Sequence, residues 1–236
     1  MAMLEVNSLN ASYGDIQVLW DVSFHVDQNE FVVLVGANGA GKSTIMKAVS
    51  KLIEPDSGTI LFNGRDITPL QPYQIVEQGL AHVPEGRQLF PEMTVKDNLE
   101  MGSLSPHAKA RRSRSYEWVM ELFPRLRERQ KQMADALSGG EQQMCAIARG
   151  LMSVPTMMIF DEPSLGLSPM LTQEVFRLVE LIRQQGVTIL MVEQNVKQTL
   201  SICDRAYVLE NGRVVMEGPG RELLEDEGVK EAFLGI

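Results

Sequence analysis

The feature that most constrains this 236-residue chain is the segment Gly36–Thr44, which reads Gly-Ala-Asn-Gly-Ala-Gly-Lys-Ser-Thr. It fits the pattern G-x-x-x-x-G-K-[ST], whose glycines let successive backbone N–H groups turn inward around phosphate oxygens. The apolar run Phe31–Val35 precedes it, and residues 43–52 carry the apolar spacing of a helix with one buried face. A buried strand, a glycine-rich loop and a helix in this order predict a phosphate-binding loop in an α/β fold.

The residues of this loop suit a nucleoside triphosphate with Mg2+. Lys42 brings a positive charge to the β- and γ-phosphates, and Ser43 offers its hydroxyl to the metal. The helix that begins there directs the positive end of its dipole at the phosphates. The expected phosphate-contacting residues are Gly36, Ala37, Asn38, Gly39, Ala40, Gly41, Lys42, Ser43 and Thr44.

Hydrophobic periodicity organises the rest of the chain. Before residue 65, short alternating runs separated by turn residues predict strands. From residue 94 to residue 150 helical periodicity replaces them, and Pro124 interrupts it. Later, strand signals flank a helix at residues 170–185, and the Asn211-Gly212 turn predicts a hairpin. We expect an α/β core with an antiparallel β subdomain, residues 1–85 and 154–236, and an inserted helical subdomain, residues 86–153.

Composition and charge narrow the class of protein. A formal net charge of -9 argues against nucleic acid as the main partner, because phosphate backbones are bound by clustered Lys and Arg. Cys145 and Cys203 are isolated and lack metal-ligand spacing, so we expect free thiols in a reducing cytoplasm. No apolar run reaches the length that crosses a bilayer, and we expect no secretory signal at the start.

Two adjacent acids end an apolar run far downstream of the phosphate loop. Asp161 stands where a P-loop fold carries the carboxylate that holds Mg2+, directly or through water. Glu162 is then placed to orient and polarise the water that attacks the γ-phosphorus. An isolated pair of this kind would be two solvated acids before Pro163. The upstream phosphate loop favours the catalytic interpretation.

The segment Leu137-Ser-Gly-Gly-Glu141 begins another expected helix. It predicts an N-cap, with Ser138 as the capping residue and Glu141 three residues later. Its exposed backbone N–H groups and the helix dipole also suit a phosphate. The two interpretations are compatible.

These five residues are identical to the signature of ABC ATPases, so the chain resembles that family. The resemblance implies a RecA-like P-loop fold that binds and hydrolyses ATP with Mg2+. It also implies a head-to-tail dimer, in which Ser138, Gly139, Gly140 and Glu141 of one subunit close over ATP held on the phosphate loop of the other.

Alignment with the family gives roles to four further residues. Tyr13 stands where the resemblance implies an aromatic residue that stacks on adenine. Glu85 replaces the usual glutamine of the Q-loop, where it would add negative charge near Mg2+ and serve as a ligand. Gln194 replaces the usual switch histidine, so it can hydrogen bond to the γ-phosphate but cannot be protonated. Ser168 replaces the usual aspartate of the D-loop.

The departures resemble one subgroup, the LivF-type ATPase subunits of branched-chain amino acid importers. The matching segments are 83–87, 123–126, 137–144, 162–169, 192–195 and 232–235. The resemblance implies ATP hydrolysis coupled to import of branched-chain amino acids, or of related amino acids and amides. It also implies a second ATPase subunit, two membrane permease subunits, an external solute-binding protein, and a position on the inner face of the plasma membrane.

Two other functional classes share the core motifs. A soluble ATPase that assembles iron-sulfur clusters would need no membrane partner, and composition does not exclude it. A DNA-repair or translation ATPase would clamp nucleic acid. Acidic charge disfavours this last class, and the roughly fifty residues between Glu85 and Leu137 leave no room for a long coiled coil.

Overall fold

The computed structural model describes residues 2–234, so Met1, Gly235 and Ile236 lie outside it, including the last residue of the 232–235 match. The chain forms two compact units. Among the described residues, the first unit comprises residues 2–72, 160–162 and 188–234, and the second comprises Tyr73–Ile159 and Pro163–Val187.

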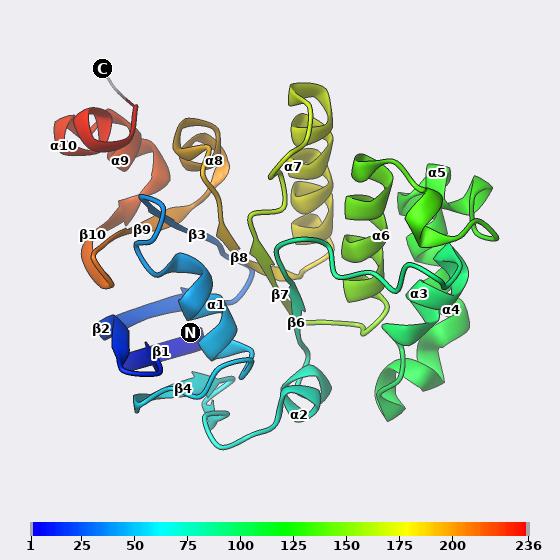
Figure 1. Ribbon diagram of the computed structural model, residues 1–236, viewed down its shortest axis with the longest axis horizontal. Coiled ribbons are helices and arrows are strands. Elements are labelled where there is room, and N and C mark those ends of the chain that lie inside the picture. Colours follow the sequence, from blue (N-terminus) through cyan, green and yellow to red (C-terminus); the bar gives the residue numbers. More distant parts are fainter. Residues whose placement is uncertain (1, 235–236) are drawn as a thin grey trace. The chain divides into compact units, whose positions relative to one another are not determined.

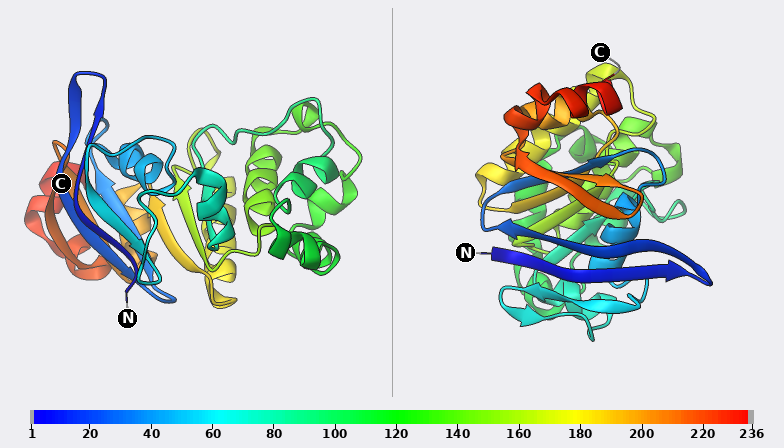
Figure 2. Two further views of the ribbon diagram at one scale, coloured as in Figure 1. Left: turned by 90° about the horizontal axis from the view of Figure 1, so that it is seen from below. Right: turned by 90° about the vertical axis from the view of Figure 1, so that its left-hand side faces the viewer.

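An antiparallel sheet in the first unit confirms the predicted β subdomain. Its strand order is β2-β1-β4-β5. Gly14, at φ +59°, and the pair Asn63 and Gly64, at +51° and +72°, make the tight turns between neighbouring strands. Figure 2 shows β1 and β2 as a long two-stranded ribbon in blue. The strands are β1 (Ala2–Tyr13), β2 (Ile16–Asp27), β4 (Ser57–Phe62) and β5 (Arg65–Asp66).

The second sheet of this unit is mainly parallel, with the order β10-β9-β3-β8-β7. β3 pairs in parallel with both β8 and β9, and every residue of β3 and β8 is buried. Burial on both faces explains why these strands are continuous apolar runs rather than alternating ones. The Asn211-Gly212 turn joins β9 to β10, which confirms the predicted hairpin. The strands are β3 (Phe31–Gly36), β7 (Met157–Asp161), β8 (Thr188–Val192), β9 (Arg205–Glu210) and β10 (Arg213–Pro219).

The helix after the phosphate loop is shorter than its apolar spacing predicts. It ends at Val49 instead of Leu52. Ser50 caps it, Lys51 takes a left-handed φ of +57°, and Leu52 is 56% exposed. The prediction was wrong because Leu52 continues the spacing without joining the core. The helices of this unit are α1 (Lys42–Val49), α8 (Val196–Ile202), α9 (Gly220–Glu225), α10 (Glu227–Val229) and η2 (Lys230–Leu234).

Helices dominate the second unit, and α6 lies beside α3 and α5 in it (Figure 1). Gly102 lets α3 approach α6 closely, because a Cβ there would collide with the carbonyl oxygen of Arg149. Pro124 starts α5 after α4 has ended at Leu122, as the sequence predicts. The elements are α2 (Pro72–Glu77), β6 (Leu80–Val83), α3 (Val95–Met101), α4 (Pro106–Leu122), α5 (Pro124–Glu128), η1 (Ala134–Ala136), α6 (Gly139–Leu151) and α7 (Pro169–Gln184).

The predicted helical subdomain, residues 86–153, lies wholly within this second unit, which also holds most of α2, β6, the start of β7 and α7. Its exact boundaries stay a prediction. Between residues 2 and 234, no helix is both long enough and apolar enough to cross a membrane.

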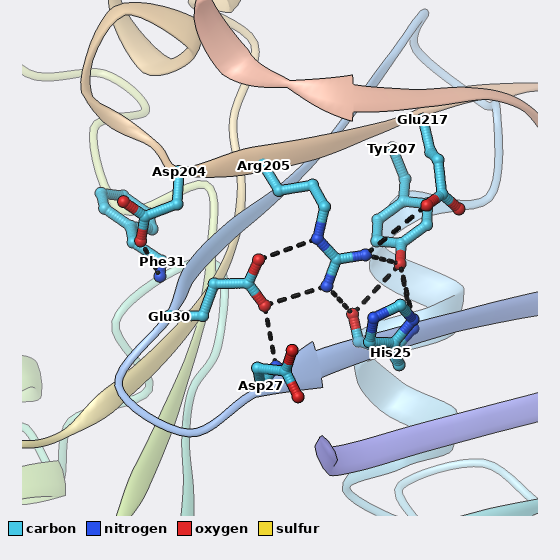
Figure 3. Close-up of polar contacts among 8 residues, drawn as sticks. All are labelled: His25, Asp27, Glu30, Phe31, Asp204, Arg205, Tyr207 and Glu217. Carbon is cyan, nitrogen blue, oxygen red and sulfur yellow. Dashed lines mark hydrogen bonds and ion pairs between the residues drawn. The ribbon is translucent and has the colours of Figure 1, made fainter. Parts of the chain in front are cut away.

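A polar cluster around Arg205 connects β2, the turn between β2 and β3, and β9 of the first unit (Figure 3). Arg205 donates from Nε to Glu30 Oε1 at 2.8 Å and from Nη2 to Glu30 Oε2 at 2.9 Å. The same Nη2 donates to the carbonyl oxygen of His25 at 2.9 Å, and the guanidinium lies 5.0 Å from the ring centre of Tyr207. Burial alone would raise the pKa of Glu30, but hydrogen bonds from Arg205 and from the backbone N–H of Asp27 outweigh it and lower that pKa.

We expect Arg205→Gln to lower the free energy of unfolding by about 3 kcal/mol at neutral pH, because the largely buried Glu30 carboxylate loses its cation. The folded-state pKa of Glu30 lies below its unfolded value. The stabilisation is therefore present above the unfolded pKa, about 4.3, and is lost as pH falls through the folded pKa. Urea unfolding of both proteins at several pH values between about 7 and 3 measures this difference.

Arg127→Gln is the matched control, because Arg127 and Glu117 pair at 2.8 Å while their side chains are 52% and 66% exposed. We expect Arg127→Gln to lower the free energy of unfolding by less than about 1 kcal/mol. Equal effects of the two substitutions at pH 7 would contradict the role given to Arg205.

Candidate functional site

Steric constraints explain the glycines of the phosphate loop. Gly36 ends β3, and a Cβ on it would collide with the carbonyl oxygen of Leu209 in β9. Gly41 has φ +102°, and a Cβ there would lie 2.7 Å from Leu19 Cδ2. Gly39 also has a left-handed φ, +82°. The loop between β3 and α1 therefore needs glycine where the pattern has it.

Lys42 is the first residue of α1 and is only 4% exposed. Its ammonium group donates to the carbonyl oxygens of Gly36 at 2.9 Å and Ala37 at 3.0 Å. Burial lowers the pKa of Lys42, while the nearby carboxylates of Glu162 and Asp161 oppose that shift. An ammonium group has three protons, so one remains for a phosphate oxygen after the loop carbonyls are satisfied.

Ser43 and Asp161 meet beside this loop. Asp161 ends β7, is 1% exposed, and accepts a hydrogen bond from Ser43 Oγ to its Oδ1 at 2.7 Å. A hydroxyl and a carboxylate oxygen side by side fit Mg2+, which takes few protein ligands and completes its shell with water and phosphate oxygens. In residues 2–234 no group of three or more His, Cys, Asp or Glu residues has the arrangement of a metal site. A Mg2+ ion here would therefore be held jointly with the phosphates.

Glu162 and Gln194 come together from the ends of neighbouring strands. Gln194 Nε2 donates to Glu162 Oε2 at 2.7 Å. Glu162 has φ +48°, and its backbone N–H donates to the carbonyl oxygen of Val192 at 3.0 Å. A left-handed conformation is strained for a glutamate, and such strain is held by surrounding structure at functional positions. The Glu162 carboxylate therefore points toward the side-chain amide of Gln194.

Gln194→Leu should lower the kcat of ATP hydrolysis by up to about 100-fold, because Glu162 loses the donor that holds its carboxylate. Gln194→His keeps a donor and should retain hydrolysis or raise it. Steady-state phosphate release measures kcat, and binding of a fluorescent ATP analogue provides the control, since loss of one hydrogen bond to the γ-phosphate should weaken ATP affinity by no more than about 10-fold. A wild-type kcat in the Leu variant would remove Gln194 from this role.

Tyr13 lies at the end of β1, opposite Ile16 across the hairpin turn. The two side chains are 46% and 71% exposed. An exposed aromatic face of this kind suits stacking on a planar base. Its assignment to adenine stays a prediction.

The signature segment has the predicted capping box at the start of α6. Ser138 N donates to Glu141 Oε2 at 3.0 Å, and Ser138 Oγ accepts from Glu141 N at 3.4 Å. Gly140 packs against α7, where a Cβ would lie 2.7 Å from Leu171 Cδ1. Glycine at this position therefore lets α6 and α7 approach each other.

The loop that carries Glu85 is tied to the same helix by a residue that sequence reasoning missed. Gly86, Arg87 and Gln88 all have left-handed φ, at +74°, +65° and +47°. Arg87 Nη1 donates to Gln142 Oε1 at 2.9 Å, and its Nη2 lies 3.1 Å from where a Cβ on Gly139 would be. The sequence offers only Gly86 as a sign of an unusual loop.

The remaining predicted residues are also in the second unit. Ser168 is the N-cap of α7 and accepts from Leu171 N at 3.4 Å. Glu85 is exposed. Its role as a Mg2+ ligand, the D-loop role of Ser168 and the nucleotide contact of the signature stay predictions.

Comparison with known proteins gives the family. The model of the ABC transporter family matches residues 19–165, more than half of the chain. The chain is 46% identical to the "High-affinity branched-chain amino acid transport ATP-binding protein BraG" of Pseudomonas aeruginosa, over 99% of this chain and 100% of that protein. It is 37% identical to the "Probable branched-chain amino acid transport ATP-binding protein LivF" of Archaeoglobus fulgidus, over 99% of each.

A solved structure has the same fold over the whole chain. It is the ADP conformation of an ATP-binding cassette of an ABC transporter, with a TM-score of 0.87, 28% identity and 100% of both chains covered. The family model, the full-length relatives and this structure agree on the family. The chain belongs to the ABC transporter family of ATP-binding proteins.

Proposed function

We propose that this chain is the ATP-binding and hydrolysing subunit that energises import of branched-chain amino acids, or of related amino acids and amides, through an ABC transporter. The observation that carries the proposal is the joint placement of Ser43, Asp161, Glu162 and Gln194 beside the Lys42 loop. The full-length likeness to two proteins named for branched-chain amino acid transport supports the cargo class.

Each side chain of this cluster has a defined task in hydrolysis. The loop N–H groups and Lys42 hold the β- and γ-phosphates. Ser43 and Asp161 would hold Mg2+, which supplies positive charge to the phosphate oxygens when bound. Glu162 accepts a proton from the attacking water, whose oxygen forms the new bond to the γ-phosphorus as the bond to the ADP oxygen breaks. Gln194 fixes the Glu162 carboxylate and offers an uncharged donor to the γ-phosphate.

The proposed assembly has two such chains, or one with a similar ATPase subunit, arranged head to tail. The signature residues from Ser138 to Glu141 then complete the nucleotide site of the opposite subunit. Two membrane permease subunits and an external solute-binding protein complete the transporter, which places this chain on the inner face of the plasma membrane. The acidic net charge of -9 supports the absence of a nucleic acid partner.

The test is uptake of labelled leucine, with a panel of competing amino acids and amides, in cells whose own copy is replaced by the intact chain or by Glu162→Gln. Loss of uptake in the variant, with the protein present at normal amounts, is expected, and the competitors then rank the solutes. Unchanged uptake of every solute would contradict the proposal and favour a cytoplasmic assembly ATPase without a membrane partner.

A further inference from the structure

An ion pair lies directly behind the signature serine. Arg129, which caps the C-terminal end of α5, approaches Glu141 with Nε 2.7 Å from Oε1. Glu141 Oε2 faces the other way and accepts from Ser138 N at 3.0 Å and from Ser138 Oγ at 2.8 Å. The Glu141 side chain is 12% exposed, and that of Arg129 is 44% exposed. Both carboxylate oxygens of Glu141 are therefore engaged, one by the cation and one by Ser138.

The position of Glu141 creates an electrostatic conflict under the proposed function. A carboxylate in the first turn of α6 is favourable for the helix itself, because it faces the positive end of the dipole. The same carboxylate is unfavourable for a triphosphate brought to that helix start, because like charges repel across an interface. Burial alone would raise the pKa of Glu141, but hydrogen bonds from Ser138 and the positive charges of Arg129 and Arg125 outweigh it and lower that pKa. Glu141 is thus ionised at neutral pH.

The hydroxyl of Ser138 adds a second conflict. A serine hydroxyl has one proton, and here Ser138 donates it to Glu141 Oε2. Ser138 must release this bond to donate to a phosphate oxygen. An unpaired carboxylate would hold the proton strongly, because hydrogen bonds to charged acceptors are the stronger ones. A carboxylate whose charge is shared with a guanidinium competes less with the phosphate.

We infer that Arg129 is a positioning residue for the signature: its ion pair with Glu141 neutralises the carboxylate that holds Ser138, so that the start of α6 accepts the phosphate of a nucleotide on the opposite subunit. The inference rests on the proposed head-to-tail dimer. Arg129 then affects how the signature closes over the nucleotide of the partner subunit. It has no effect on ATP binding to the phosphate loop of its own subunit. A purely structural brace between α5 and α6 would act differently, because it would depend on the bond and not on the charge.

A double-mutant cycle separates charge from bracing. Glu162→Gln serves as the background, because it should bind ATP and keep the closed dimer. The cycle adds Arg129→Gln, Glu141→Gln and both together. Glutamine at position 141 still offers an oxygen to Ser138 N–H but carries no charge to neutralise. Analytical ultracentrifugation gives the ATP concentration at which half the chains are dimeric, and a fluorescent ATP analogue gives monomer affinity.

We expect Arg129→Gln to raise the ATP concentration for half-dimerisation at least about 10-fold without changing monomer affinity. In the Glu141→Gln background, the same Arg129 substitution should change the ATP concentration for half-dimerisation by less than about twofold. Arg127→Gln is the matched control, because Arg127 lies in α5 and pairs with the exposed Glu117 instead. It should leave dimerisation unchanged.

A loss from Arg129→Gln that is equally large in the Glu141→Gln background would overturn the inference, since Arg129 would then act independently of Glu141. A comparable loss from Glu141→Gln by itself would also overturn it, since the lost bond between α5 and α6, and not an uncompensated charge, would explain it. No loss from Arg129→Gln would overturn it as well. If the Glu162→Gln background itself binds ATP yet stays monomeric at every ATP concentration, the proposed dimer is refuted. The role of Arg129 is then refuted with it. The Glu162→Gln background thus tests the dimer, and the cycle tests the role of Arg129.

Discussion

Lys42→Ala is expected to weaken ATP binding by at least about 100-fold, because it removes the only charged donor placed inside the phosphate loop. Lys42 is 4% exposed, and its ammonium group donates to the carbonyl oxygens of Gly36 and Ala37. Without it those oxygens would face the phosphates with no cation between them. Isothermal titration with Mg2+ and ATP measures the change in Kd.

Lys47→Ala provides the matched control, since Lys47 lies in the last turn of the same helix and outside the loop. Its ATP affinity should equal that of the unchanged chain. Retained affinity in Lys42→Ala, with a normal unfolding midpoint, would refute the assignment of the phosphate loop.

Glu162→Gln is expected to lower the kcat of ATP hydrolysis by about 100- to 10,000-fold while ATP still binds. A glutamine keeps the size of the side chain but cannot accept the proton of the attacking water. Because the nucleotide is not consumed, the ATP-bound dimer should accumulate, and sedimentation should show it. Phosphate release under single-turnover conditions measures the loss in the chemical step.

Glu210→Gln, at the exposed end of β9, is the control for the effect of removing one negative charge from this unit. It should hydrolyse ATP at the normal rate. Undiminished turnover in Glu162→Gln would show that another group activates the water.

Local patterns predict the central features of the fold and site because their determinants are adjacent in sequence. The apolar run before Gly36 and the lysine after Gly41 together specify the strand, loop and start of α1. The capping box of Ser138 and Glu141 is equally local, with its partners three residues apart. The end of α1 is the exception, because nothing in the spacing shows that Leu52 stays exposed.

Contacts between distant segments could not be predicted in the same way. Both Glu162 and Gln194 are found by motif, but their 2.7 Å hydrogen bond depends on β7 and β8 being neighbours in the sheet. Arg87 reaches Gln142 across 55 positions of sequence. Arg129 is one of several arginines around α5, and only the packing of α5 against α6 selects it as the partner of Glu141.

The most direct test of the account uses the complete transporter, purified through a tag on this chain and placed in proteoliposomes with Mg2+ and ATP on the side of this subunit. The initial rate of labelled leucine transport is compared for the intact chain and for Glu162→Gln. We expect ATP-dependent transport that the substitution abolishes. Transport that continues at the same rate with Glu162→Gln, or without ATP, would contradict it.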